Sequence, residues 1–152
     1  MSGFAVRAVT PEDREQWCAL YAGYRAFYRL EPDDDVVHTA WEWVLDREHS
    51  LFGLVAASED QLLGLANGRW FARPSAGGMG LYLDDLFTAT EARGRGVASA
   101  LLDELAVVAA SENASVVRWV TAEDNSAARS VYDVHAKATQ WVTYDMQPLE
   151  IH

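Results

Sequence analysis

One stretch of the chain, residues 81–105 with the sequence LYLDDLFTATEARGRGVASALLDEL, decides the fold. Its first part, Leu81–Thr88, has the length and apolar content of a strand, whereas Val97–Ser111 repeats apolar side chains at helical spacing. Between them, Gly94 and Gly96 lack Cβ atoms, so the backbone can turn sharply and approach a ligand closely. The first amides of a helix have no partner within it and lie at its positive end. The stretch therefore predicts a strand, a tight turn and a helix whose start can bind phosphate.

Two arginines in this turn, Arg93 and Arg95, favour the same interpretation because guanidinium groups form charge-assisted hydrogen bonds with phosphate oxygens. The segment does not match GxxxxGK[ST] or GxGxxG, so neither a P-loop nor a dinucleotide-binding turn is supported. The alternative is a tight strand-to-helix connection that carries two solvated arginines and binds nothing.

The rest of the chain predicts one α/β (α+β) domain over residues 1–152. An aromatic-rich helix follows Pro11, a second begins near Asp33, and a short third one spans residues 125–135. Residues 74–80 suggest a flexible loop. The expected order is βααβββαβαβ, a mixed sheet with helices on both faces. The expected strands are residues 4–9, 51–57, 62–71, 81–88, 116–121 and 138–146.

Composition narrows the function. The net charge of −11, from 12 basic and 23 acidic residues, disfavours nucleic acid and suits a cationic substrate. A single cysteine, Cys18, allows no internal disulfide, and we expect it to be a core residue and not a nucleophile. Because no apolar run approaches the roughly 20 residues of a membrane span and the start does not resemble a signal peptide, we expect a cytoplasmic protein. The histidines lack metal-ligand spacing, so we expect no metal; they are His38, His49, His135 and His152.

The turn resembles a known signature. Residues 93–98, RGRGVA, match [Q/R]-x-x-G-x-[G/A], the acetyl-CoA signature of the GCN5-related N-acetyltransferases (GNAT), and the order of elements is similar over nearly the whole chain. The acidic pair in LDDLF, residues 83–87, and the segment AEDN, residues 122–125, most resemble the spermidine/spermine N-acetyltransferase branch. The resemblance implies that the cosubstrate is acetyl-CoA.

The resemblance also implies roles for individual residues. The backbone of three strand residues would pair with the pantetheine arm, namely Leu86, Phe87 and Thr88. The amides of the turn would hold the pyrophosphate, namely Arg93, Gly94, Arg95, Gly96, Val97 and Ala98. Asn125 would contact the cofactor near its reactive end, and the Tyr132 phenol would protonate the leaving sulfur.

Acetylation of an amine needs a base, because a protonated amine is not a nucleophile. By resemblance Asp84 is the first choice and Asp85 the second, and either can bind the cationic amine. Since neighbouring strand residues point to opposite faces, we expect only one of them to line the cleft. We expect a backbone N–H, that of Phe87, to stabilise the carbonyl oxygen. Without the resemblance, Tyr132 suits a core position on its short helix.

We also expect Tyr28 to contact the substrate. The neighbouring aromatic residues Tyr24, Trp41 and Trp43 can line an acceptor pocket, but their helical spacing favours core packing for most of them.

The sequence departs from the family after Tyr132, where no glycine follows and the C-terminal part offers one strand in place of a hairpin. A partner subunit would complete that sheet, so a homodimer is a hypothesis. The leading functional hypothesis is acetylation of a small primary amine, such as a polyamine, an amino acid or a related metabolite. The alternatives are a protein or peptide N-acetyltransferase and a non-catalytic acetyl-CoA-binding module.

Overall fold

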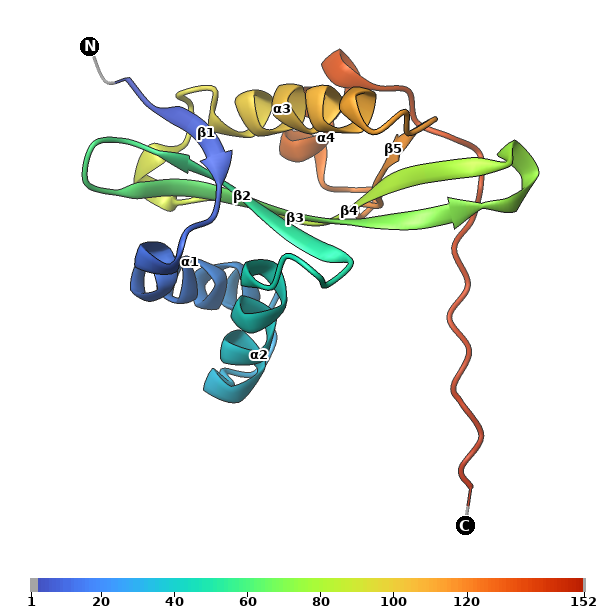
Figure 1. Ribbon diagram of the computed structural model, residues 1–152, viewed down its shortest axis with the longest axis horizontal. Helices are drawn as coiled ribbons and strands as arrows, with labels where there is room; N and C mark the ends of the chain where they lie inside the picture. The colour runs from blue at the N-terminus through green and yellow to red at the C-terminus, as the bar shows by residue number, and fades with distance from the viewer. Residues whose placement is uncertain (1–2, 152) are drawn as a thin grey trace.

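A five-stranded sheet forms the centre of the computed structural model, which describes residues 3–151 (Figure 1). The strands lie side by side in sequence order, and β4 and β5 form the single parallel pair within that range. Short connections join β2 to β3 and β3 to β4 as antiparallel neighbours, whereas the parallel pair requires a crossover helix. The strands are β1 (Ala5–Ala8), β2 (Leu51–Ala57), β3 (Leu62–Arg73), β4 (Gly78–Thr88) and β5 (Val117–Arg118).

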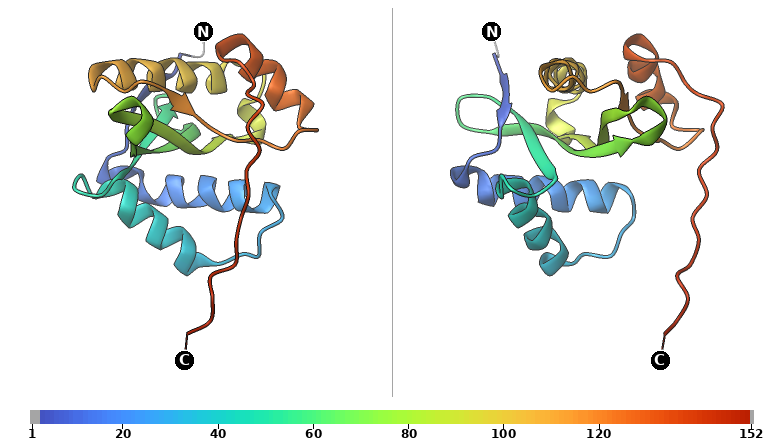
Figure 2. Two further views of the ribbon diagram at one scale, coloured as in Figure 1. Left: turned by 90° about the vertical axis from the view of Figure 1, so that its right-hand side faces the viewer. Right: turned by 45° about the vertical axis from the view of Figure 1, so that its right-hand side comes forward.

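Helices cover both faces of the sheet (Figures 1 and 2). Helices α1 (Arg14–Phe27) and α2 (Asp34–Leu45) lie on one face, and α3 (Val97–Ser111) and α4 (Ser126–His135) lie on the other. This arrangement confirms the predicted α+β class with a mixed, mostly antiparallel sheet.

The two faces have separate cores. On the α3 face, Leu101 and Leu105 are fully buried against Leu81 and Leu83 of β4. On the other face, Trp17 of α1 is fully buried among residues of α2, β2 and β3. Burying side chains of this size stabilises the fold by roughly 1.5–3 kcal/mol each. Strand β4, which contains the acidic pair Asp84 and Asp85, is thus held in position between two packed layers.

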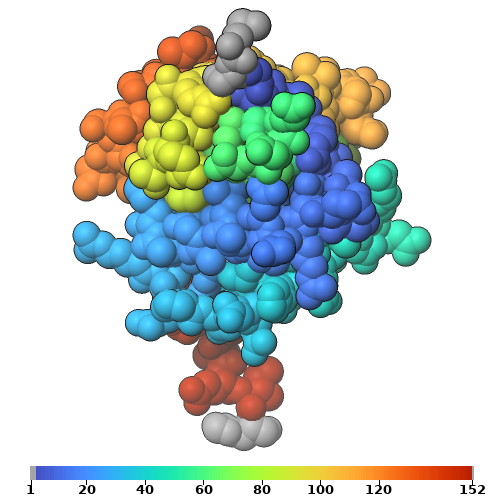
Figure 3. All heavy atoms as spheres, turned by 90° about the vertical axis from the view of Figure 1, so that its left-hand side faces the viewer, coloured from blue at the N-terminus to red at the C-terminus, as the bar shows by residue number. Residues whose placement is uncertain are grey.

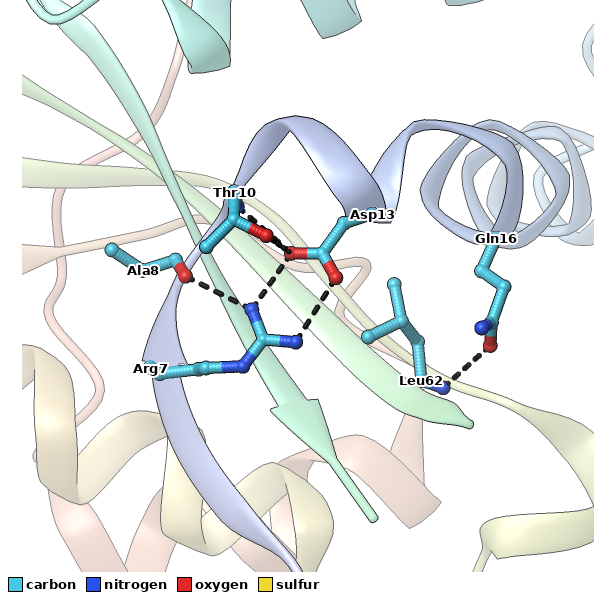
Figure 4. Close-up of polar contacts among 6 residues, drawn as sticks. All are labelled: Arg7, Ala8, Thr10, Asp13, Gln16 and Leu62. Atoms are coloured by element: carbon cyan, nitrogen blue, oxygen red, sulfur yellow. Dashed lines mark hydrogen bonds and ion pairs between the residues drawn. The ribbon is translucent and has the colours of Figure 1, made fainter. Parts of the chain in front are cut away.

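An ion pair joins β1 to the start of α1 (Figure 4). The two terminal guanidinium nitrogens of Arg7 donate to the Asp13 carboxylate, at 2.7 and 3.0 Å, and the Thr10 amide donates to the same carboxylate at 2.8 Å. The hydrogen bonds from Arg7 hold the pKa of Asp13 below its ordinary value of 3.8. Nearby, the Gln16 side chain accepts a hydrogen bond from the Leu62 amide, which ties α1 to β3.

Replacing Asp13 with asparagine is expected to lower the free energy of unfolding by about 1–2 kcal/mol at neutral pH. Because the folded state binds this proton more weakly than the unfolded chain, the stabilisation is complete above pH 3.8. It is lost as the pH falls through the lowered pKa of Asp13. Urea unfolding at several pH values measures it, with Glu12→Gln in the same turn as the control. A deficit of D13N that does not shrink in acid would contradict this role.

The structure departs from the sequence predictions in three places. Residues 74–80 form no long loop, because β3 extends to Arg73, β4 begins at Gly78, and a short 3-10 turn, Pro74–Ala76, lies between them. Strand β5 pairs over two residues only, whereas residues 116–121 were expected. Residues 138–146 form no strand, so the predicted final β element is wrong for the single chain. No helix within residues 3–151 is long and apolar enough to cross a membrane.

Candidate active site

The site begins where β4 and β5 diverge. The two strands pair at Leu81 with Val117 and at Tyr82 with Arg118, and no pairing between them is found beyond Tyr82 in the described chain. On its other side, β4 stays paired with β3 as far as Thr88. The edge of β4 after Tyr82 therefore faces a gap and not a strand, so its backbone groups on that side can pair with a ligand.

A bulge in β4 sets the direction of the acidic pair. Gly68 of β3 faces Leu83, and the next residue back along β3, Asn67, already faces Asp85, so Asp84 is the extra residue. Asp84 accepts a hydrogen bond from Arg69 at 2.9 Å, and Asp85 accepts one from Asn67 at 3.0 Å. Since these β3 partners are two residues apart, both aspartates lie on one face of the sheet. The expectation that they point to opposite faces is wrong, because alternation fails at a bulge.

The gap between β4 and β5 opens into a cleft of about 250 Å³. Asp84 lines this cleft and Asp85 does not, because Asp85 is turned towards α1, where it accepts a hydrogen bond from the Tyr21 hydroxyl at 3.2 Å. Tyrosines from α1 and α4 and the segment after β5 complete the wall. The lining residues are Tyr24, Tyr28, Leu83, Asp84, Leu86, Trp119, Val120, Thr121, Ala122 and Tyr132.

Tyr132 lies in the wall of this cleft, on α4, with its ring edge-to-face against Trp119 at 5.3 Å between centroids. Burial, with a smaller contribution from Tyr28, raises the pKa of the Tyr132 phenol above its ordinary value of 10.0. The group therefore stays protonated at neutral pH and can donate a proton. The core position that helical spacing also allowed describes only one side of Tyr132. That side packs against Trp119, and the other side lines the cleft.

Asp84 has the properties of a base. Burial raises the pKa of its carboxyl above the ordinary value of 3.8, and the neighbouring Arg69 guanidinium opposes that rise. A raised pKa makes a carboxylate a stronger proton acceptor. The Arg69–Asp84 ion pair joins β3 to β4, with the Asp84 side chain 29% exposed towards the cleft.

The turn before α3 forms a cradle of backbone amides. Gly96 caps the helix with φ of 80° and Gly94 has φ of 78°, a region that favours glycine. The first intrahelical hydrogen bond runs from the Ala100 amide to the Gly96 carbonyl, and no side chain caps the helix. The amides of residues 97–99 are thus left for a ligand. Figure 3 shows this turn, in yellow, on the surface next to α1.

The guanidinium groups lie beside this cradle. Arg93 is exposed and stacks on the Phe27 ring at the end of α1, 5.3 Å from the ring centroid. Arg95 is exposed as well. A Cβ atom built on either glycine of the turn would meet nothing within 4 Å, so there is open space at the helix start. The amides, the positive helix end and the arginines together fit a diphosphate.

The direction of the β4 backbone corrects one expectation. The Ala89 amide donates to the Leu63 carbonyl of β3, so Phe87, two residues earlier, also turns its backbone groups towards β3. Leu86 and Thr88 then present their N–H and C=O groups to the open edge. Phe87 is therefore wrong as the N–H donor to a carbonyl oxygen, and its ring packs among α1 residues such as Tyr24.

The remaining predicted site residues divide into those at the cleft and those away from it. Asn125 is the residue at the N-terminal cap position of α4, and its side-chain amide donates a hydrogen bond to the hydroxyl of Thr121, a cleft residue, at 3.4 Å. Among the aromatics, Tyr24 and Tyr28 line the cleft, whereas Trp41 is a core residue and Trp43 stacks on His49.

Among residues 3–151, no cysteine or histidine lines the cleft. Burial raises the pKa of the Cys18 thiol, which disfavours the thiolate. No cluster of three metal-ligating side chains occurs among residues 3–151. His152 lies outside the described residues.

Several site residues were missed by sequence reasoning. Arg69 and Asn67 on β3 partner the acidic pair, and Tyr21 holds Asp85 from α1. The two-residue spacing of Asn67 and Arg69 on a strand was a signal that both share a face, but the register that places them beside β4 is not local. Trp119 and the residues after it were predicted only as strand.

A helix start with free amides, an open strand edge and a cleft lined by a carboxylate and a phenol together suit an α+β transferase whose ligand carries a diphosphate. The family comparison is consistent with this, because residues 14–135 match the model of the acetyltransferase (GNAT) family. The chain therefore belongs to the GNAT family and is an acetyl-CoA-dependent N-acetyltransferase.

Similar proteins cover the chain almost completely. A D-amino-acid N-acetyltransferase of Saccharomyces cerevisiae is 26% identical over 146 residues, 91% of this chain and 88% of the relative. A thialysine N-epsilon-acetyltransferase of Caenorhabditis elegans is 25% identical over 158 aligned positions, 100% of this chain and 97% of the relative. The crystal structure of a probable acetyltransferase has the same fold, with a TM-score of 0.84, 23% identity and coverage of 97% and 99% of the two chains.

Proposed function

We propose that the chain acetylates the primary amine of a small molecule, such as a polyamine, an amino acid or a related metabolite, by direct attack within a ternary complex. The observation that carries this proposal is that one cleft is lined by both a carboxylate, Asp84, and a protonated phenol, Tyr132. At about 250 Å³ the cleft suits a small acceptor. The two curated relatives, which act on a D-amino acid and on thialysine, support the same class.

The cosubstrate would lie across the features described above. The amides of residues 97–99, with Arg93 and Arg95, would hold the diphosphate, and Leu86 and Thr88 would pair with the pantetheine arm. Acetyl-CoA supplies an activated acetyl group as a thioester. Asn125, at the start of α4, is proposed to contact its reactive end.

The protein's residues would then handle two protons. Asp84 accepts a proton from the bound ammonium group and leaves a neutral amine that can attack the carbonyl. The N–H groups of Leu86 and Thr88 face the gap, so one of them can donate to the carbonyl oxygen. The Tyr132 phenol donates its proton to the departing sulfur. Asp85, Tyr24 and Tyr28 are proposed to position the cationic acceptor.

A thiol-release assay over polyamines, amino acids, aminoglycosides and peptides tests the proposal. We expect turnover with small amines and slower turnover with peptides. Turnover with peptides alone would establish the protein N-acetyltransferase alternative. Absence of turnover across the panel, with coenzyme A still bound, would overturn the proposed class of acceptor.

Replacing Arg69 with glutamine is expected to move the acidic limb of the kcat/KM profile to higher pH. Asp84 acts as the carboxylate, so activity falls as the pH drops through its pKa, and Arg69 lowers that pKa. The pH dependence of kcat/KM for the best acceptor measures the shift. Arg73→Gln is the matched control, because Arg73 lies on the same strand and bonds to Ser115, away from the pair. An unmoved limb in R69Q would show that Asp84 is not the titrating base.

A further inference from the structure

Helix α4, which carries the Tyr132 phenol, has no fully buried side chain to anchor it. It is ten residues long, and a helix of that length is marginal in water unless other elements pack against it. The segments on either side of it, residues 119–125 and 136–151, pair with no strand in the described chain. The position of the phenol therefore depends on how α4 is attached to its neighbours.

Among the helices and strands, α4 packs chiefly against α3, and one side chain joins the two (Figure 2). His135, the last residue of α4, places its ring Nε2 3.1 Å from the Ser99 hydroxyl oxygen and its Nδ1 3.4 Å from an Asp103 carboxylate oxygen. Ser99 and Asp103 lie about one turn apart on α3, so a single imidazole reaches both. Within residues 3–151, the other side-chain hydrogen bonds of α4 stay inside residues 121–135.

The contact with Ser99 is a hydrogen bond in either charge state of the imidazole, because a serine hydroxyl can donate or accept. In the neutral ring, the Asp103 carboxylate favours a hydrogen on Nδ1, so Nε2 accepts from the Ser99 hydroxyl. In the charged ring, both nitrogens donate. The His135 side chain is 17% exposed and that of Asp103 is 73% exposed. The Ser99 bond is thus the stronger of the two attachments, because water screens an exposed carboxylate.

The two ends of this bridge belong to the two halves of the site. Ser99 lies in the first turn of α3, whose free amides are proposed to hold the diphosphate. Tyr132 lies three residues before His135, and residues three apart on a helix share a face. The bond that fixes His135 therefore also fixes the direction in which the phenol points. The distance between the phenol and a thioester anchored by its diphosphate would depend on that bond.

We propose that His135 is a positioning residue: through its bond to Ser99 it holds Tyr132 where the phenol can protonate the departing sulfur. The inference rests on the proposed role of Tyr132 as proton donor. His135 does not line the cleft, so it acts through Tyr132 and not on the acceptor. Its effect belongs to kcat and not to binding of coenzyme A, because the buried residues Leu101 and Leu105 hold α3 in place without it.

The test is a double-mutant cycle between His135→Leu and Tyr132→Phe, with kcat for the best acceptor as the readout. Leucine fills much of the space of the imidazole and forms neither polar contact. We expect H135L to lower kcat by about 10- to 100-fold, the cost of misplacing a catalytic group by about 1 Å. In the Y132F background we expect no further loss, because no phenol remains to be positioned. Calorimetry should give H135L an affinity for coenzyme A within about twofold of the native value.

Two further variants identify the bond itself. Ser99→Ala keeps the backbone amide, removes the hydroxyl and suits a helix, so we expect it to fold and to lose kcat as H135L does. His135→Gln places an amide near the position of Nε2, where it can bond to Ser99, and we expect it to retain most of the native kcat. Val134→Leu is the matched control on the same turn, because Val134 is 81% exposed, and we expect native kinetics.

Three results would overturn the inference. The first is native kcat in H135L and S99A while Y132F loses activity, which leaves the role of Tyr132 intact. The second is losses that multiply in the double variant, as they do for a residue that only stabilises the fold. The third is native kcat in Y132F, which would remove the proposed proton donor as well. If H135L does not fold, S99A with and without Y132F gives the same comparison.

Discussion

Replacing Gly96 with aspartate is expected to abolish binding of coenzyme A, with a loss of affinity of about 100-fold or more. The backbone at Gly96 has φ of 80°, where a residue with a Cβ atom is strained, so the cap of α3 would distort. The new carboxylate would also place negative charge at the helix start, where the diphosphate is proposed to bind. A 100-fold loss corresponds to about 2.7 kcal/mol, which these two effects together can supply. Isothermal titration calorimetry with coenzyme A measures it.

Gly77→Asp is the matched control for this variant. Gly77 also has a positive φ, of 63°, and open space around it, but it lies in the turn between β3 and β4. The control therefore introduces the same strain and the same charge away from the cradle. We expect G77D to bind coenzyme A like the native chain. Unchanged affinity in a folded G96D protein would place the diphosphate elsewhere.

Replacing Tyr132 with phenylalanine is expected to lower kcat by about 10²–10⁴-fold, the usual contribution of a general acid. The KM for acetyl-CoA should change little, because the ring and its packing against Trp119 are retained. Burial raises the pKa of the Tyr132 phenol above 10.0, so its ionisation should reduce activity only in strongly alkaline solution. Steady-state kinetics with the best acceptor measure both parameters.

Tyr82→Phe is the control for the loss of a phenol. Tyr82 lies on β4 two residues before Asp84 and does not line the cleft. The Arg69 guanidinium stacks over its ring, 4.7 Å from the ring centroid. Phenylalanine keeps that ring, so we expect near-native kinetics. If Y132F retained native kcat, another group or water would be the proton donor and the assigned role would be wrong.

Elements with strong local signals were predicted from the sequence almost to the residue. Val97–Ser111 and Leu51–Ala57 have the bounds expected from apolar periodicity and flanking turn residues. The cradle at Gly96 was also predictable, because it depends only on a glycine turn that opens a helix. These features are fixed by neighbours in the chain.

Features that depend on pairing between distant segments were not predicted. The bulge at Asp84 arises from the register between β3 and β4, and it turns both aspartates to one face. The same register directs the Phe87 amide to β3. Whether Tyr24 packs in the core or lines the cleft depends on where α1 meets β4, which helical spacing alone does not reveal. Residues 138–146 have the composition of a strand, but they pair with no strand among residues 3–151.

The most direct test of the central claim is an amide-resolved NMR titration of the isotopically labelled protein with coenzyme A. The account predicts that the amides of Val97, Ala98 and Ser99 shift first and furthest, followed by Leu86 and Thr88 along the open edge of β4. A binding isotherm in which these five amides stay unmoved, while others shift, would contradict the account.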